Sequence, residues 1–309
     1  MLSRIAESLF WMGRYIERAD GTARLLDVQM QLLLEDPWIE EDQACRSLLE
    51  VIGSTSIFPH LLTKEELLQT ISLDRGDDSS IANSILSARE NARRVREVIS
   101  TELWEAINTT KSRLPRKVAF EKSHDFFAWV RERTAIVVGV VEGSMTRDEA
   151  WNFFMLGRAL ERVDMTARLL ATSELTATAG PSWTTILRSC GAYESYLRTY
   201  RGVPSATNAA EFLLLDRYFP RSVLFALNNS EESLNELNPE TGRSHNSDLA
   251  QRQIGLLRTS LEFRSASEIM GNLRQEMVQL QQRVAEVSAS ISSRYFPANV
   301  LPTWIGEVS

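Results

Sequence analysis

The stretch MGRYIERADGTARLL at residues 12–26 returns as LGRALERVDMTARLL at residues 156–170. When the comparison is extended to Phe10–Leu26 and Phe154–Leu170, eleven of seventeen positions are identical. Chance at average composition would give about one or two identities. The chain is therefore predicted to contain a duplicated unit, with a long period that excludes a solenoid.

Helical periodicity dominates the whole chain. Apolar residues recur at spacings of three and four from Leu9 to Leu33, which predicts a helix that ends near Pro37. TKEE at residues 63–66 and TRDE at residues 146–149 have the form of capping boxes. Pro220 is expected at or near the first turn of another helix. Further helices are predicted near residues 80–113, 123–143, 182–200, 206–216, 221–237 and 269–291.

No segment shows the alternation that strands require, so the sequence predicts an all-α fold. We expect a multi-helix bundle built from two pseudo-symmetric, duplicated halves, at about residues 1–145 and 146–309. In this arrangement the two copies of the repeated helix lie side by side near a pseudo-twofold axis. The two halves together form a single domain over residues 1–309.

Composition narrows the classes of function. The 309 residues are 43% apolar and 24% charged, which is typical of a globular protein that can bury a large core. A net charge of −7 gives no attraction to phosphate backbones, so nucleic acid is an unexpected partner. No stretch has the roughly 20 apolar residues of a membrane span. The isolated Cys45 and Cys190 favour a reducing cytoplasm.

The charged side chains of the repeated helix are its most informative feature. Apolar residues lie all round this helix, so the charges are expected to be buried, where each needs a partner. Within one helix, Arg14 can pair with Glu17 and Asp20 with Arg24. Between the copies, Glu17 can meet Arg162 while Glu161 meets Arg18. The candidate residues are Arg14, Glu17, Arg18, Asp20 and Arg24 in the first copy and Arg158, Glu161, Arg162, Asp164 and Arg168 in the second.

Two interpretations of these charges stay open, and a third is disfavoured. They can form a reciprocal salt-bridge network that fixes the register of two half-bundles, or a small pocket whose arginines clamp a carboxylate or phosphate. A metal site is disfavoured, because no Glu-x-x-His motif accompanies the acids and six arginines would repel a cation. No cofactor is expected. Glu90, Asn91 and Arg93 could extend a pocket or belong to a solvated charged face.

Four segments carry a resemblance to a known family: residues 1–28, SARENARRVRE, ALERVDMTARLL and RYFPRSVLFAL. Together they make the chain similar to the alpha-E family, a bacterial all-helical domain named for its Glu-Arg motifs. These motifs are Glu17-Arg18 and Glu161-Arg162 here, and the resemblance covers essentially the whole chain. It implies neighbouring genes for a circularly permuted ATP-grasp ligase, a transglutaminase-like peptidase and sometimes a proteasome-like peptidase. It carries no catalytic residues.

The resemblance implies a role in making, attaching or degrading a peptide. The sequence therefore leads us to expect a non-catalytic accessory or peptide-binding protein that works with an ATP-grasp ligase. One alternative is an enzyme that acts on a peptide or amino-acid derivative, with Glu17 or Glu161 as acid/base. Another is a purely structural assembly subunit. Internally paired charges would favour the first or the last, and an open cleft with an exposed glutamate would favour the enzyme. The sequence gives no oligomeric state.

Overall fold

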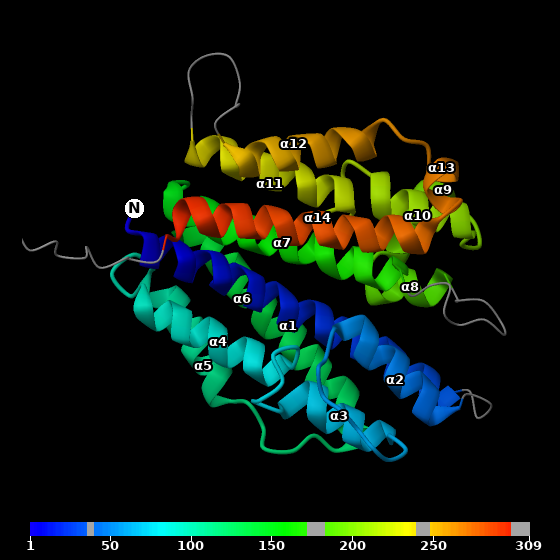
Figure 1. The fold of residues 1–309 in the computed structure, drawn as a ribbon. Helices are drawn as coiled ribbons and strands as arrows, with labels where there is room; N and C mark the ends of the chain where they lie inside the picture. The colour runs from blue at the N-terminus through cyan, green and yellow to red at the C-terminus, as the bar shows by residue number, and fades with distance from the viewer. Residues whose placement is uncertain (36–39, 172–182, 239–247, 298–309) are drawn as a thin grey trace, which may run out of the picture.

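The structure, a computed structural model, describes residues 1–35, 40–171, 183–238 and 248–297. Within these residues it contains fourteen α-helices, one short 3-10 helix and no strand (Figure 1). The all-α prediction is therefore confirmed.

The helices run in the order in which the chain introduces them. The part up to residue 144 contains α1 (Ser3–Glu35), α2 (Glu41–Ile52), α3 (Lys64–Leu73), α4 (Ile81–Arg94), α5 (Thr101–Ser112), η1 (Phe120–Lys122) and α6 (Ser123–Ser144). The remainder contains α7 (Glu149–Ala171), α8 (Trp183–Ser189), α9 (Tyr193–Tyr200), α10 (Ala206–Leu215), α11 (Val223–Leu237), α12 (Leu249–Glu262), α13 (Ala266–Met270) and α14 (Leu273–Tyr295).

The repeated helices, α1 and α7, lie side by side at the centre of the molecule (Figure 1). Helices α4 and α6 pack on α1, and α5 covers that pair from outside. Helices α11 and α14 pack on α7, and α12 covers them in the same way. The adjacency of the two Glu-Arg helices is thus present, while a twofold relation between the halves stays a prediction.

The central helices are buried on several sides. Leu9, Phe10 and Met12 point in different directions around α1, yet each is 0% exposed. Burial of a side chain of this size contributes roughly 1.5–3 kcal/mol. The C-terminal end of α14 closes the same region, because Phe296 packs its ring on Phe10 and Phe153 at centroid distances of 5.6 and 5.9 Å.

The predicted helix over residues 80–113 is wrong, because the structure divides it into α4 and α5. Ser80 caps the first of these helices, and its side chain accepts a hydrogen bond from the backbone N–H of Asn83. Ser100 caps the second in the same way and accepts from the backbone of Leu103. A side-chain acceptor at the start of a helix replaces a missing backbone partner, which makes the break at Ser100 stable.

Other helix starts also differ in part from the sequence predictions. The capping box at Thr63 is confirmed, with Glu66 completing it. The box at Thr146 is wrong, since Asp148 supplies the acceptor for the backbone N–H of Ala150 at 2.9 Å. Pro220 lies outside helix α11, which Ser222 caps. The last predicted helix is two helices, α13 and α14.

The crossing of α1 and α7 is a backbone contact. A Cβ atom on Gly13 would lie 2.1 Å from the carbonyl oxygen of Phe154, and one on Gly157 would lie 2.0 Å from that of Phe10. Neither distance leaves room for any side chain, so glycine is required at both places. This close approach sets the register of the two helices and brings their charged residues opposite one another.

Candidate functional site

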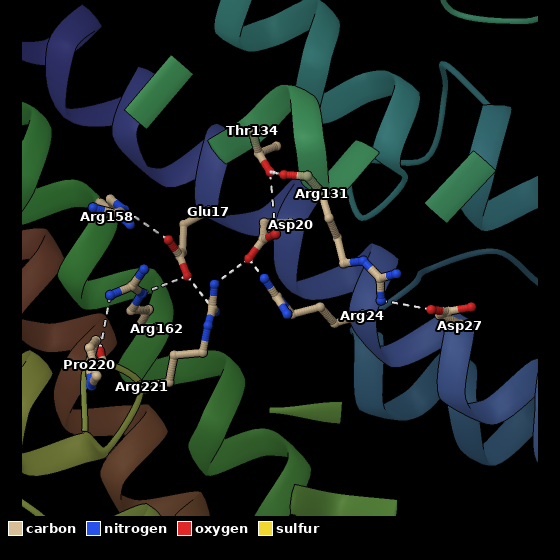
Figure 2. A network of polar contacts seen from close by, with 10 residues as sticks. All are labelled: Glu17, Asp20, Arg24, Asp27, Arg131, Thr134, Arg158, Arg162, Pro220 and Arg221. Carbon is tan, nitrogen blue, oxygen red and sulfur yellow. Dashed lines mark hydrogen bonds and ion pairs between the residues drawn. The ribbon is translucent and has the colours of Figure 1, made fainter. Parts of the chain in front are cut away.

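Glu17, on α1, is bound by three arginines. Its carboxylate accepts hydrogen bonds from Arg158 Nε at 3.0 Å, Arg162 Nε at 2.6 Å and Arg221 Nη1 at 2.7 Å (Figure 2). Two of these arginines come from α7 and the third from the segment that precedes α11. The glutamate side chain is 4% exposed, so arginine replaces water around the carboxylate.

Glu161, on α7, has the reciprocal environment. It accepts from Arg14 Nε at 2.7 Å and from Arg18 Nε at 2.5 Å, and its side chain is 2% exposed. The structure therefore contains both predicted cross pairs, Glu17 with Arg162 and Glu161 with Arg18. The predicted pair of Arg14 with Glu17 is wrong, because the crossing places the carboxylate of Glu161 beside Arg14 instead.

The outer donors of two arginines fasten neighbouring segments to the network. Arg18 Nη1 donates to the backbone carbonyl of Asp78 at 3.4 Å, just before α4. Arg162 Nη1 donates to the carbonyl of Pro220 at 3.0 Å, just before α11. Each guanidinium thus binds a carboxylate and a backbone segment at once, as its fixed fork of donors allows.

The two aspartates of the repeat have different surroundings. Asp20 pairs with Arg24 at 2.9 Å, as the sequence predicted, and also with Arg221. Thr134 of α6 donates a further hydrogen bond to it at 3.3 Å (Figure 2). Asp164 pairs with Arg168 of its own helix at 3.1 Å. The Asp20 side chain is 8% exposed and that of Asp164 17%, so the first copy is the more enclosed.

Sequence reasoning missed Arg221, which joins Glu17 to Asp20. When the two LDR segments are aligned, Ser79 occupies the corresponding place in the first half, so the repeat gave no reason to select Arg221. A usable signal was its position directly before Ser222, which caps α11. A cation there faces the positive end of the helix dipole and therefore needs an acidic partner.

The pKa values follow from burial and from these partners. Burial alone would raise the pKa of Glu17, but Arg162, Arg221 and Arg158 outweigh it and hold that pKa well below its usual range. For Glu161, burial is outweighed by Arg18 and Arg14, which lower its pKa to about 2. Burial lowers the pKa of Arg162 to about 10, against the attraction of Glu17. All three groups are therefore charged at neutral pH.

A small cavity lies beside the network. Glu17, Arg162, Arg221, Ser189 and Cys190 are among the residues that line it, and its volume is about 30 Å³. This is room for one or two water molecules, far below the roughly 300 Å³ of a small-molecule site. Ser189 Oγ is buried without a hydrogen-bond partner, which suits such a water. The thiol of Cys190 is unreactive, because burial raises its pKa to about 12.

The secondary candidates lie on the surface of α4. Arg93 Nη2 donates to Glu90 at 2.6 Å, and Asn91 Nδ2 donates to the carbonyl of Ser87 at 2.8 Å. In the part of the chain that the structure describes, none of the three candidates bonds to the central network. The structure thus places them in a charged, solvated face.

Two searches of the described residues found no further site. No three histidine, cysteine, aspartate or glutamate side chains gather there as metal ligands would. None of the helices in the same ranges is both long and apolar enough to traverse a lipid bilayer.

The geometry agrees with a family comparison. The Alpha-E family, described as a predicted alpha-helical domain with a conserved ER motif, matches residues 1–296. The chain therefore belongs to the Alpha-E family. Its two Glu-Arg pairs, Glu17-Arg18 and Glu161-Arg162, each place the glutamate against arginines of the opposite helix. The adjacent arginine of each pair binds the opposite glutamate.

Curated relatives are longer proteins. An uncharacterized protein of Mycobacterium bovis is 24% identical over 335 residues, and an uncharacterized protein of Mycobacterium tuberculosis is 23% identical over the same length. The match covers 97% of this chain but 38% of each relative. No solved structure matches the chain.

Proposed function

We propose that this chain is a non-catalytic helical accessory protein that works with an ATP-grasp peptide ligase. It binds the ligase, the ligase's peptide product, or both. The resemblance to the alpha-E family supplies the partner, and peptidases of the transglutaminase-like or proteasome-like type are the expected further components. The cytoplasm is the expected compartment, consistent with two free cysteines that are both buried.

One observation carries the non-catalytic half of the proposal. Glu17 and Glu161 are the acid/base candidates, and both are buried and surrounded by internal arginines. Their low pKa values make them poor proton acceptors at neutral pH, and the adjoining cavity admits only water. A general base has to reach a proton on a substrate, and neither carboxylate has such access. The network is therefore better suited to hold two half-bundles together.

The long relatives support the accessory half. A region equivalent to nearly all of this chain is joined there to a larger remainder in one polypeptide. Such an arrangement is expected when a domain works beside another protein or domain. A purely structural assembly subunit is the second candidate, because the same closed network requires no ligand.

Affinity purification from the native host tests the proposal, with and without ATP and amino acids. We expect an ATP-grasp ligase to be retained, and calorimetry with the purified ligase to give a binding isotherm. Retention of other subunits without the ligase would favour the structural candidate. Absence of binding together with turnover of a peptide by the chain alone would establish the enzyme instead.

A further inference from the structure

The largest hollow on the described surface lies away from the arginine network. It is a groove of about 530 Å³ between helix α3 and the segment of residues 117–121. This volume falls within the roughly 300–1,000 Å³ of ligand sites. Figure 1 shows α3 at one end of the molecule, with the segment that leaves α5 passing beside it. The groove is thus separate in position from the central crossing of α1 and α7.

The two walls of the groove are fastened to each other. Gln69 of α3 donates its side-chain amide to the carbonyl of Val118 at 2.5 Å. The side-chain oxygen of Gln69 accepts from the backbone N–H of the same residue at 3.5 Å. Lys64 lies over the ring of Phe120 at 5.1 Å from the centroid, which adds a cation–π contact. A groove held in this way is preformed, so a ligand loses little free energy in ordering it.

The groove has an apolar lining. Phe58 and Phe120 are half-buried, while Leu68 and Val118 are buried beneath them. The apolar surface continues outside, because Ile57, next to Phe58 in the chain, is 90% exposed and Leu61 is 77% exposed. Large apolar side chains exposed beside a groove are typical of surfaces that bind other proteins. A ligand that covers both parts must extend beyond a single residue.

The charges around this lining are mainly acidic. Glu65, Glu66 and Glu121 line the groove against one basic residue, Lys117. Glu66 is already engaged, since it completes the cap of α3 and pairs with His60 at 2.9 Å. Glu65 and Glu121 are exposed and form no ion pair within the described ranges. Two free carboxylates beside an apolar lining complement a cationic side chain that adjoins an apolar one.

We infer that this groove binds a peptide segment that carries a basic side chain beside an apolar one. The apolar side chain contacts Phe58 and Phe120, and the cation is held by Glu65 and Glu121. The inference rests on the proposed accessory function and gives it a location. It also moves peptide capture from the buried arginines to an acidic surface, which reverses the charge expected of the ligand.

The probe is the labelled peptide acetyl-Leu-Arg-Phe-Arg-amide, with acetyl-Leu-Glu-Phe-Glu-amide as its matched acidic control. Fluorescence anisotropy with the full chain should show binding of the basic peptide and much weaker binding of the acidic one. The double variant Glu65→Gln, Glu121→Gln should lower the affinity roughly tenfold or more. Ala119→Trp places a bulky ring at an exposed position in the groove and should block binding without a change of charge.

The control is Glu232→Gln, Glu236→Gln, which removes two exposed carboxylates from α11. It should leave both the affinity and the melting temperature unchanged. Equal binding of the basic peptide to all variants, or no binding to the native chain, would overturn the inference. A dimer in size-exclusion chromatography that Ala119→Trp dissociates would assign the groove to a second copy and also overturn it.

Failure of the groove and failure of the proposed function give different results. If native and Ala119→Trp proteins retain the ligase equally but the peptide binds neither, the accessory function stands and the groove assignment fails. If the peptide binds as expected but no ligase is retained, the groove assignment stands and the ligase partnership fails.

Discussion

At the scale of single residues, the central feature is the exchange of partners between two glutamates. Glu17 depends on arginines at positions 158, 162 and 221, and Glu161 depends on Arg14 and Arg18. A buried ion pair is weak evidence for net stability, because the desolvation of both charges opposes their attraction. Loss of one partner is nevertheless costly, since the remaining charge stays buried without compensation.

Glu17→Gln should therefore destabilise the fold strongly. The amide keeps the shape of the side chain but leaves Arg158, Arg162 and Arg221 without their common anion. We expect a loss of about 3–5 kcal/mol in the free energy of unfolding. This corresponds to a decrease in melting temperature on the order of 10 °C. Thermal denaturation by circular dichroism measures it, with Glu236→Gln as the exposed control.

An unchanged melting temperature for Glu17→Gln would contradict a stabilising role for the pair. If ligase binding disappeared in the same variant, Glu17 would instead belong to a binding site. The control separates both outcomes from a general effect of removing negative charge, because Glu236 is exposed on α11.

Glu161 should make stability sensitive to acid. Its pKa is about 2 in the folded protein and 4.5 without these interactions, so the unfolded chain binds a proton first as pH falls. The stabilisation is fully present above pH 4.5 and is lost as the pH falls towards 2. The difference corresponds to about 3 kcal/mol.

Urea denaturation at several values between pH 5 and pH 2 measures this dependence. Glu161→Gln should be less stable at neutral pH and should show a flatter decline of stability with acid. The same slope in the native protein and the variant would show that another carboxylate governs acid unfolding.

At the scale of helices, the glycines at the crossing are the most restrictive positions. Gly13→Ala or Gly157→Ala places a methyl group about 2 Å from a backbone carbonyl oxygen, which only a separation of α1 and α7 can relieve. Such overpacking costs typically 1–3 kcal/mol, and here it also stretches the ion pairs. We expect each variant to be clearly destabilised in urea or thermal unfolding.

Gly139→Ala provides a matched control within a helix. Gly139 lies in α6, and a Cβ atom there meets nothing within 4 Å. This variant should gain about 0.5–1 kcal/mol, because alanine favours the helix more than glycine does. Equal effects at Gly13 and Gly139 would show that helix propensity, and not the crossing, determines the result.

The sequence was informative where pattern and structure share a period. The repeat located α1 and α7 and both cross pairs, because identical residues at one spacing imply one geometry. The break between α4 and α5 was hidden, since charged residues continue from Arg93 to Glu97 without a glycine or proline. Only the cap at Ser100 marks that break, and a lone serine is common inside helices.

Two parts of the candidate sites depend on contacts that no local pattern encodes. Arg221 reaches Glu17 across 204 residues of sequence and has no counterpart in the other half. The groove is formed where Gln69 meets Val118, and the second wall is a segment of irregular backbone and one 3-10 turn. Periodicity predicts helices but not which loop lies against them.

At the scale of the whole molecule, the network joins parts of the chain that are distant in sequence. Its bonds between α1 and α7 span 141 to 147 residues. Neither half can satisfy its own buried glutamate, because the partners of Glu17 and Glu161 lie in opposite halves. The bundle should therefore unfold as one cooperative unit.

Separate expression of residues 1–145 and 146–309 tests this expectation. We expect each fragment alone to be largely unfolded or aggregated, and co-expression to give a helical complex. Circular dichroism and size-exclusion chromatography measure the two properties. A fragment that is helical, monomeric and unfolds cooperatively alone would mean that the chain consists of two independent domains.

The close approach at Gly13 and Gly157 also limits how the protein can move. A slide of α1 along α7 by one helical turn, about 5.4 Å, would bring Glu17 to the place that Gly13 now occupies. The adjoining backbone leaves no space for that side chain, so the central pair behaves as a locked axle. Any change of shape on binding must then come from the outer helices, such as α3, turning about a centre that keeps its register.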